Sequence, residues 1–381
     1  MHHTEFELTF SNANEQQFHI ALKQASQEYL QAKQDHVYAS LADLTVIGVL
    51  FIVALLSYLP TIMTTSTSIY ILSYFVFVLL IMLLNVIGQH DACHNTLFKS
   101  GWKNRLFGRL VTLPLGLEPE FWRTRHVHYH HHYANIEHYD LDTEENGIFR
   151  QTPFQRWRPF MKYQHIYWPF IASLSLTWIA LVFDWSDRTG KTRLKAQKVL
   201  EGKLGWGLFL GSKICHLILM LGIPLFVAHN HGISLTTIFI TYLLSQMVAS
   251  IFVIYLLLGT HWAETQFFTA PEDKQIKHGW YHHNFVTACD WLPTPHYLWR
   301  LTGGLNYHLT HHIFPHWHHR HYPALAQILA RLAQQYDMPY RCIDYKQLVA
   351  AQIRFLKKMG NRHYSKNISH FENNNLLNYY L

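Results

Sequence analysis

The residues with the greatest capacity for chemistry in this sequence are its histidines, which gather in three clusters. The chain of 381 residues contains 30 histidines, nearly as many as its 31 lysines and arginines together. The clusters occupy residues 90–94, 126–132 and 308–312, and the first two contain imidazoles four residues apart. Side chains at this spacing project from one face of a helix, where they can bind the same metal ion. The clusters therefore predict a metal site, provided that the fold brings them together.

The number of clustered imidazoles favours two metal ions. It exceeds what one tetrahedral zinc ion uses, and neutral nitrogen ligands suit iron, copper, zinc or nickel. A carboxylate-bridged diiron bundle is excluded, because no paired Glu-x-x-His lies within the apolar segments. In the second cluster two spacings are open, since His128, His131 and His132 also fit a shorter ligand pattern. The candidate ligands at the favoured spacing are His90, His94, His126, His130, His131, His308, His311 and His312.

Four long apolar segments must position these clusters. Residues 44–63, 69–88, 208–228 and 233–258 carry a single charge between them, Lys213. About 20 apolar residues in a helix are needed to cross a bilayer core of roughly 30 Å. Helices of a soluble protein would show one polar face, which these segments lack. They predict four transmembrane helices in two hairpins.

The charges of the connecting loops predict which way the hairpins face. Residues 64–68 and 228–234 contain no lysine or arginine, whereas residues 99–162 and 184–205 are rich in both. Positively charged loops stay in the cytoplasm. All three histidine clusters and both termini are then cytoplasmic. A fifth apolar stretch, residues 166–183, has cytoplasmic flanks on both sides, so we expect it to lie in the membrane interface, anchored by Tyr167, Trp168 and Trp178.

The predicted fold is an all-α integral membrane protein: two transmembrane hairpins, interfacial helices and a cytoplasmic helical cap that holds the metals. Residues 1–40 form a cytoplasmic amphipathic segment without the pattern of a signal peptide, with Phe18, Leu22, Ala25 and Tyr29 at helical spacing. Residues 41–360 form the membrane domain, which includes an amphipathic helix beginning at Pro323. Residues 361–381 are polar and are expected to be disordered.

Composition narrows the classes of partner. The formal net charge is +7, but its confinement to loops indicates the cytoplasmic face of a membrane protein and not a nucleic-acid-binding protein. The four cysteines are more than fifty residues apart, which argues against a disulfide framework.

The three clusters, in this order and with these spans between them, resemble the membrane fatty acid desaturase family. Four segments carry the likeness: residues 89–100, 121–142, 303–315 and His319-Arg-His-Tyr-Pro323. They are similar to the acyl-lipid and acyl-CoA branch that contains the front-end, linoleoyl-CoA-type desaturases, here without a fused cytochrome domain. The likeness covers about residues 40–360. It implies two non-haem iron ions with imidazole ligands, which use dioxygen to introduce a cis double bond into a fatty acyl chain.

The resemblance also implies individual roles. Tyr133-Ala-Asn135 after the second cluster matches the branch with the longer spacing, and His308 stands where many front-end desaturases have glutamine. His261, in Thr260-His-Trp-Ala-Glu264, is expected to be a ninth ligand. Carboxylates and other polar groups commonly orient metal-bound imidazoles by a hydrogen bond to the second ring nitrogen. Residues expected in such positions behind the ligands are Asp91, Asn135, Asp140, Asp142 and Glu264. His283 is expected either behind the ligands in the same way or without a role. The histidines that follow the third cluster are expected to pack and not to ligate.

Desaturation consumes two electrons, and the sequence shows no carrier for them. It contains no H-P-G-G haem segment, no cysteine set for an iron–sulfur cluster and no G-x-G-x-x-G after a strand. We therefore expect an external donor, an acidic ferredoxin or a b-type cytochrome, and a fatty acyl lipid or acyl-CoA as substrate. Two alternatives remain open: a hydroxylase, epoxygenase or ketolase with the same clusters, and a metal-binding or transport protein, for which only His216 lies within a span.

Overall fold

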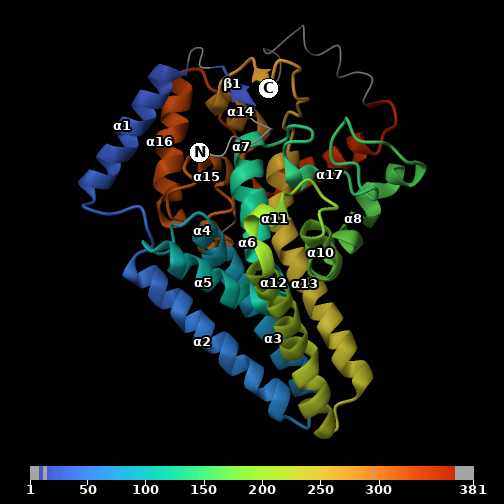
Figure 1. Ribbon diagram of the computed structural model, residues 1–381. Helices are drawn as coiled ribbons and strands as arrows, with labels where there is room; N and C mark the ends of the chain where they lie inside the picture. Colours follow the sequence, from blue (N-terminus) through green and yellow to red (C-terminus); the bar gives the residue numbers. More distant parts are fainter. Residues whose placement is uncertain (1–7, 12–14, 294, 365–381) are drawn as a thin grey trace.

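The computed structural model describes residues 8–11, 15–293 and 295–364, and these are mostly helical (Figure 1). Four helices of the described chain are long and apolar enough to cross a membrane. With their continuations they span Leu41–Met63, Thr67–Cys93, Gly202–Ala228 and Leu235–Leu256. The four apolar spans predicted from the sequence are therefore present.

Each long helix has a local reason for its bounds. Helix α2 (Leu41–Met63) begins at Ser40, whose hydroxyl accepts the Asp43 N–H while the Asp43 carboxylate accepts the Ser40 N–H. Helix α3 (Thr67–Leu84) packs along α2, with Tyr70 and Phe77 buried between the spans. Helices α12 (Gly202–Leu217) and α13 (Leu235–Trp262) form the second long pair. In Figure 1 all four extend away from the rest of the molecule, and short links join them in pairs at the far end.

The fifth apolar stretch is two helical pieces at 63° to each other. The first contains α8 (Gln164–Ser173), and the second runs through α9 (Ser175–Trp178) and a π-helical turn (Ile179–Phe183) into α10 (Asp184–Arg188). Of the three predicted interfacial anchors, Trp178 is exposed. Trp168 is not an anchor, because it is 5% exposed and packs against Tyr255 of α13. The prediction for Trp168 was wrong because this stretch also packs against α13, which buries the indole ring.

A cap of shorter elements covers one end of the long helices. Helix α1 (Gln16–Ala32) lies along α16 (Tyr322–Gln335), burying Phe18 and Leu22 against the apolar face of α16. Both amphipathic helices predicted from the sequence are thus confirmed. The Glu15 carboxylate accepts the Tyr281 N–H, at the first turn of α14 (Trp280–Thr287). The other helices of the cap are α4 (His90–Cys93), α5 (Gly101–Thr112), α6 (Pro119–Arg123), α7 (His131–Tyr133), α11 (Ala196–Val199), α15 (His308–Ile313) and α17 (Tyr345–Met359).

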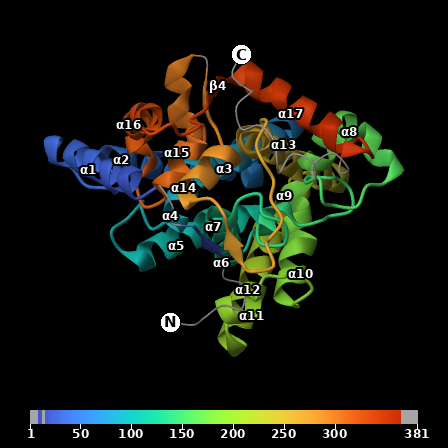
Figure 2. The same cartoon turned by 90° about the horizontal axis from the view of Figure 1, so that it is seen from above.

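The cap also contains short strands, so the fold is not purely helical. Strand β1 (Thr9–Phe10) pairs in parallel with β2 (Gln275–Ile276), and β3 (Asp290–Leu292) pairs in parallel with β4 (Cys342–Asp344). These pairs are too short to carry a hydropathy pattern. Seen from above, α4, α7, α14 and α15 lie near the middle of the cap, with α1, α16, α17 and α10 around them (Figure 2). Of the predicted polar tail, residues 365–381 lie outside the described part of the chain.

Candidate metal centre

The first histidine pair stands where α3 continues into the cap. A π-helical turn, Asn85–Gln89, joins α3 to α4, and His90 begins α4 while His94 ends it. Both imidazoles are 4% exposed, and their ring centroids are 5.3 Å apart. The predicted common face of this pair is therefore observed.

The second cluster lies in a wider helical turn than the sequence predicts. Residues Thr124–His130 are π-helical, and the His131 N–H bonds to the His126 carbonyl five residues earlier. A π-helix stacks residues five apart, which lets His126, His130 and His131 all face inward. His128 and His132 are exposed. The structure thus brings the longer ligand spacing into the centre.

Asp290 holds the third cluster in position. Its buried carboxylate accepts the Thr310 N–H at 3.0 Å and the Thr310 hydroxyl at 2.5 Å, inside α15. Burial raises the pKa of Asp290 to about 6, against the opposing effect of its hydrogen bonds with Thr310 and Tyr340. Helix α15 presents three imidazoles that are at most 2% exposed: His308, His311 and His312.

His261 joins the same centre from the end of α13. Its Nε2 atom lies 2.7 Å from His308 Nε2 and 3.1 Å from His130 Nε2. Its Nδ1–H donates to the Thr287 carbonyl at 2.9 Å, which fixes the tautomer with Nε2 free for a metal.

Eight of the nine predicted imidazoles form two neighbouring groups. One comprises His90, His94, His126 and His311, and the other comprises His130, His261, His308 and His312; within each group the potential ligand atoms lie within 4.8 Å of one another. His131 lies between the groups. Its Nε2 is 3.2 Å from His126 Nε2, and its ring stacks on His312 with centroids 4.3 Å apart.

This arrangement fits two metal ions. Metal–nitrogen bonds of about 2.0–2.1 Å place neighbouring ligand nitrogens about 3 Å apart, close to the 2.7–3.2 Å separations between these Nε2 atoms. Both ring nitrogens of His94 and of His312, and Nε2 of His311, are buried and have no hydrogen-bond partner among the described residues. Buried imidazole nitrogens without partners destabilise a fold. Metal binding would remove that penalty.

Burial also keeps most of these imidazoles in the neutral form that binds metals. It lowers the pKa of His94, His131 and His312 well below the usual range, and that of His261 to about 3. His130 differs. Burial lowers its pKa, but the neighbouring Asp140 carboxylate raises it further, to about 9.

Asp140 is the carboxylate that orients a clustered imidazole. His130 Nδ1–H donates to it at 3.1 Å, and the backbone N–H groups of Asn135 and Asp142 donate at 2.9 and 3.0 Å. Asn135 has a left-handed backbone with φ 58°, and its side-chain amide donates to the Gln266 carbonyl at 3.0 Å. Asp142 is exposed, and its carboxylate lies 3.8 Å from His130 Nδ1.

The other three residues expected behind the ligands do not contact the nine imidazoles by hydrogen bond. Asp91 accepts His319 Nδ1–H at 2.6 Å and lies 3.6 Å from His318 Nε2, a third group of potential ligands. Glu264 is exposed and pairs with Arg354 at 2.7 Å. His283 Nε2 lies 2.8 Å from the Ala134 carbonyl.

Three residues that touch the centre escaped the sequence reasoning. Tyr322 Oη lies 2.8 Å from His311 Nδ1, Trp122 stacks on the His126 ring at 4.9 Å, and the Thr287 carbonyl binds His261. Tyr322 belongs to the His-Tyr-Pro segment that carries the family likeness, which could have drawn attention to it. A backbone carbonyl has no sequence signature.

Comparisons with known proteins match this chain to one family. The family model "fatty acid desaturase" matches residues 65–344. The acyl-lipid (8-3)-desaturase of Physcomitrium patens is 25% identical over 370 residues, which are 93% of this chain and 74% of that protein. The sn-1 linoleoyl-lipid 6-desaturase of Arthrospira platensis is 28% identical over 71% of this chain and 73% of its own length. The corresponding enzyme of Synechocystis is also 28% identical, over 71% of this chain and 75% of its length.

The family match covers more than half of the chain and includes all nine clustered histidines. Non-haem iron and dioxygen are the cofactor and co-substrate of this family, and the paired imidazole groups suit two iron ions. The chain belongs to the fatty acid desaturase family and is an oxidoreductase that introduces a double bond into a fatty acyl chain.

Proposed function

We propose that this desaturase acts on acyl chains esterified in membrane lipids, at an iron pair held by nine imidazoles. The observation that carries the proposal is the convergence of these imidazoles in two buried groups at one end of four apolar helices. Acyl-lipid substrates are supported by the relatives, which are named acyl-lipid and linoleoyl-lipid desaturases. A bilayer delivers such substrates directly to a site at its surface.

The proposed ligands divide by group. His90, His94, His126 and His311 would hold one iron, and His130, His261, His308 and His312 the other, with His131 completing the first group through its approach to His126. When bound, the irons supply the dioxygen activation by which two hydrogens leave adjacent methylenes, because no protein side chain can attack an unactivated C–H bond.

The contribution of the chain is to fix ligand atoms and exclude water. Asp140 and the Thr287 carbonyl keep protons at Nδ1 of His130 and His261, so that both rings offer Nε2 toward the centre. The Tyr322 hydroxyl, 2.8 Å from His311 Nδ1, would accept the Nδ1 proton when Nε2 of that ring binds iron. The near-complete burial of these rings shields the centre from bulk solvent.

The proposed orientation places the centre and both termini in the cytoplasm. The positively charged loops lie at the end of the spans that carries the histidines, whereas the links 64–66 and 229–234 at the far end contain no lysine or arginine. An external ferredoxin or b-type cytochrome with an acidic surface would deliver the electrons to this basic side.

The test is expression of the full chain in a host with a compatible electron donor, followed by mass spectrometry of its fatty acids. We expect a new double bond, which His94→Ala and His311→Ala abolish along with bound iron, because each removes a buried ligand. His128→Ala is the matched control: it removes an exposed histidine of the second cluster and should leave product and iron unchanged. Activity and iron that survive both ligand substitutions would refute the proposed centre.

A further inference from the structure

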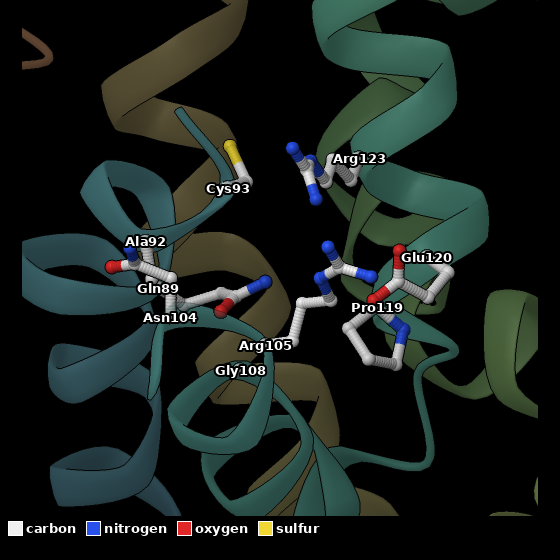
Figure 3. A pocket seen from close by; sticks show the side chains of 9 residues that line it. All are labelled: Gln89, Ala92, Cys93, Asn104, Arg105, Gly108, Pro119, Glu120 and Arg123. Atoms are coloured by element: carbon white, nitrogen blue, oxygen red, sulfur yellow. The ribbon is translucent and has the colours of Figure 1, made fainter. Parts of the chain in front are cut away.

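A small cavity of about 10 Å³ lies beside the first histidine pair and opens at the surface between α5 and α6. Its walls comprise the end of the second span, with Gln89 and Cys93, and the facing turns of α5 and α6. The guanidinium groups of Arg105 and Arg123 both point into its middle (Figure 3). The cavity is separate from the metal groups, although Arg123 is close enough to His94 to affect its pKa electrostatically.

The charges in this cavity are incompletely paired. Arg123 Nε is buried without a hydrogen-bond partner, and the exposed Arg105 forms no ion pair within the described residues. Glu120 also lines the cavity but forms no ion pair with either arginine. Two cations therefore face one carboxylate. A bound anion with several oxygen atoms would satisfy both guanidiniums, which suit phosphate or carboxylate groups.

The outer face of α5 indicates the depth of the cavity in a bilayer. Trp102, Leu106 and Leu110 recur every fourth residue and are 63%, 49% and 48% exposed. A helix with such an apolar stripe lies at the boundary between lipid head groups and acyl chains. Arg105 belongs to the same helix, and this position of α5 would place its guanidinium near the lipid phosphates.

We propose that Arg105 and Arg123 bind the phosphate group of the phospholipid whose acyl chain is desaturated. The inference rests on the proposed acyl-lipid function and names the head group that the enzyme recognises. The bound phosphate would lie beside the first histidine pair, and its contacts with the two arginines would anchor the lipid through its head group. Arg105 and Arg123 are accordingly binding residues and take no part in the oxidation.

The test measures binding separately from turnover. The full-length enzyme, in an uncharged detergent, is titrated with dihexanoyl phosphatidylglycerol, with a short-chain galactosyl diacylglycerol that lacks phosphate, and with coenzyme A. We expect Arg105→Gln and Arg123→Gln each to weaken binding of the phospholipid about tenfold, the scale of one lost charge-assisted contact. Glu120→Gln should strengthen it, because that substitution removes the competing carboxylate. Lys103→Gln is the matched control, since it removes a charge from α5 outside the cavity wall.

Turnover of phospholipid vesicles provides the second readout. The arginine variants should raise KM and leave kcat and bound iron near the original values. Phospholipid binding that is equal in the original chain and in both arginine variants would overturn the inference. Arginine-dependent binding of coenzyme A without binding of the phospholipid would overturn its assignment to a lipid. Arginine-dependent phospholipid binding without desaturation of that lipid would uphold the site and overturn the proposed acyl-lipid function.

Discussion

Replacing Asp140 by asparagine isolates the contribution of a residue that orients one imidazole of the proposed metal centre. The Asp140 carboxylate is 1% exposed and accepts three hydrogen bonds, from His130 Nδ1 and from the backbone of Asn135 and Asp142. An asparagine of the same shape retains one acceptor oxygen and replaces the other by an NH₂ donor. At least one of the three donors would then face another donor inside the protein.

The expected magnitude follows from these contacts. Loss of a residue that orients a metal-bound histidine typically reduces metal affinity or activity by about 10- to 100-fold, or about 1.4–2.8 kcal/mol. A buried donor left without an acceptor adds about 1–3 kcal/mol of destabilisation. The effect on iron should be confined to the group that contains His130, His261, His308 and His312. Asp140→Asn should therefore lose about one of two irons at limiting iron concentration.

The assay is iron content per chain during titration with a chelator, with double-bond formation measured on the same preparations. Glu264→Gln is the matched control: it also changes a carboxylate to an amide near His261, but Glu264 is exposed and paired with Arg354. That control should keep both irons. Wild-type iron affinity in Asp140→Asn would show that the His130–Asp140 contact does not orient a ligand, and equal losses in both variants would point to a general effect on the fold.

Two further substitutions test other supports of the centre. Tyr322→Phe removes the hydroxyl 2.8 Å from His311 Nδ1 and should weaken iron binding about tenfold with little change in the thermal unfolding midpoint; unchanged affinity would contradict the contact. Gly303→Ala should lower that midpoint, because Gly303 has φ 58° and an added Cβ would lie 2.2 Å from the Val86 carbonyl, at an expected 1–3 kcal/mol of overpacking. Gly48→Ala, where nothing lies within 4 Å of the added Cβ, is its control, and an equal midpoint in both variants would refute the steric argument.

Hydropathy and helical spacing were sufficient to predict the large elements. Apolar runs of bilayer length with a single charge, Lys213, identify α2, α3, α12 and α13 because lipid demands apolar side chains on every exposed face. The amphipathic spacing of Phe18 and Leu22 likewise predicts α1. Spacing within each cluster also predicts that its imidazoles share a face, since that depends on local helix geometry alone.

The surroundings of the imidazoles were less predictable because they depend on how helices end. Glu264 lies three residues after His261. If the helix continued, this spacing would place both side chains on one face, where Glu264 could orient the imidazole. Helix α13 instead ends at Trp262. Glu264 then has a left-handed backbone with φ 59°, and its exposed side chain pairs with Arg354. Asp91 directly follows His90 on one helix, so its side chain points about 100° away from that ligand and reaches His319.

The division of the imidazoles between two groups depends on the π-helical turn at the second cluster. In an α-helix, residues five apart point in different directions, so His126 and His131 would not face the same centre. The π-helical hydrogen bond from the His131 N–H to the His126 carbonyl aligns them. His126 then joins the group of His90, while His130 joins the group of His261. One short turn thereby supplies candidate ligands to both groups.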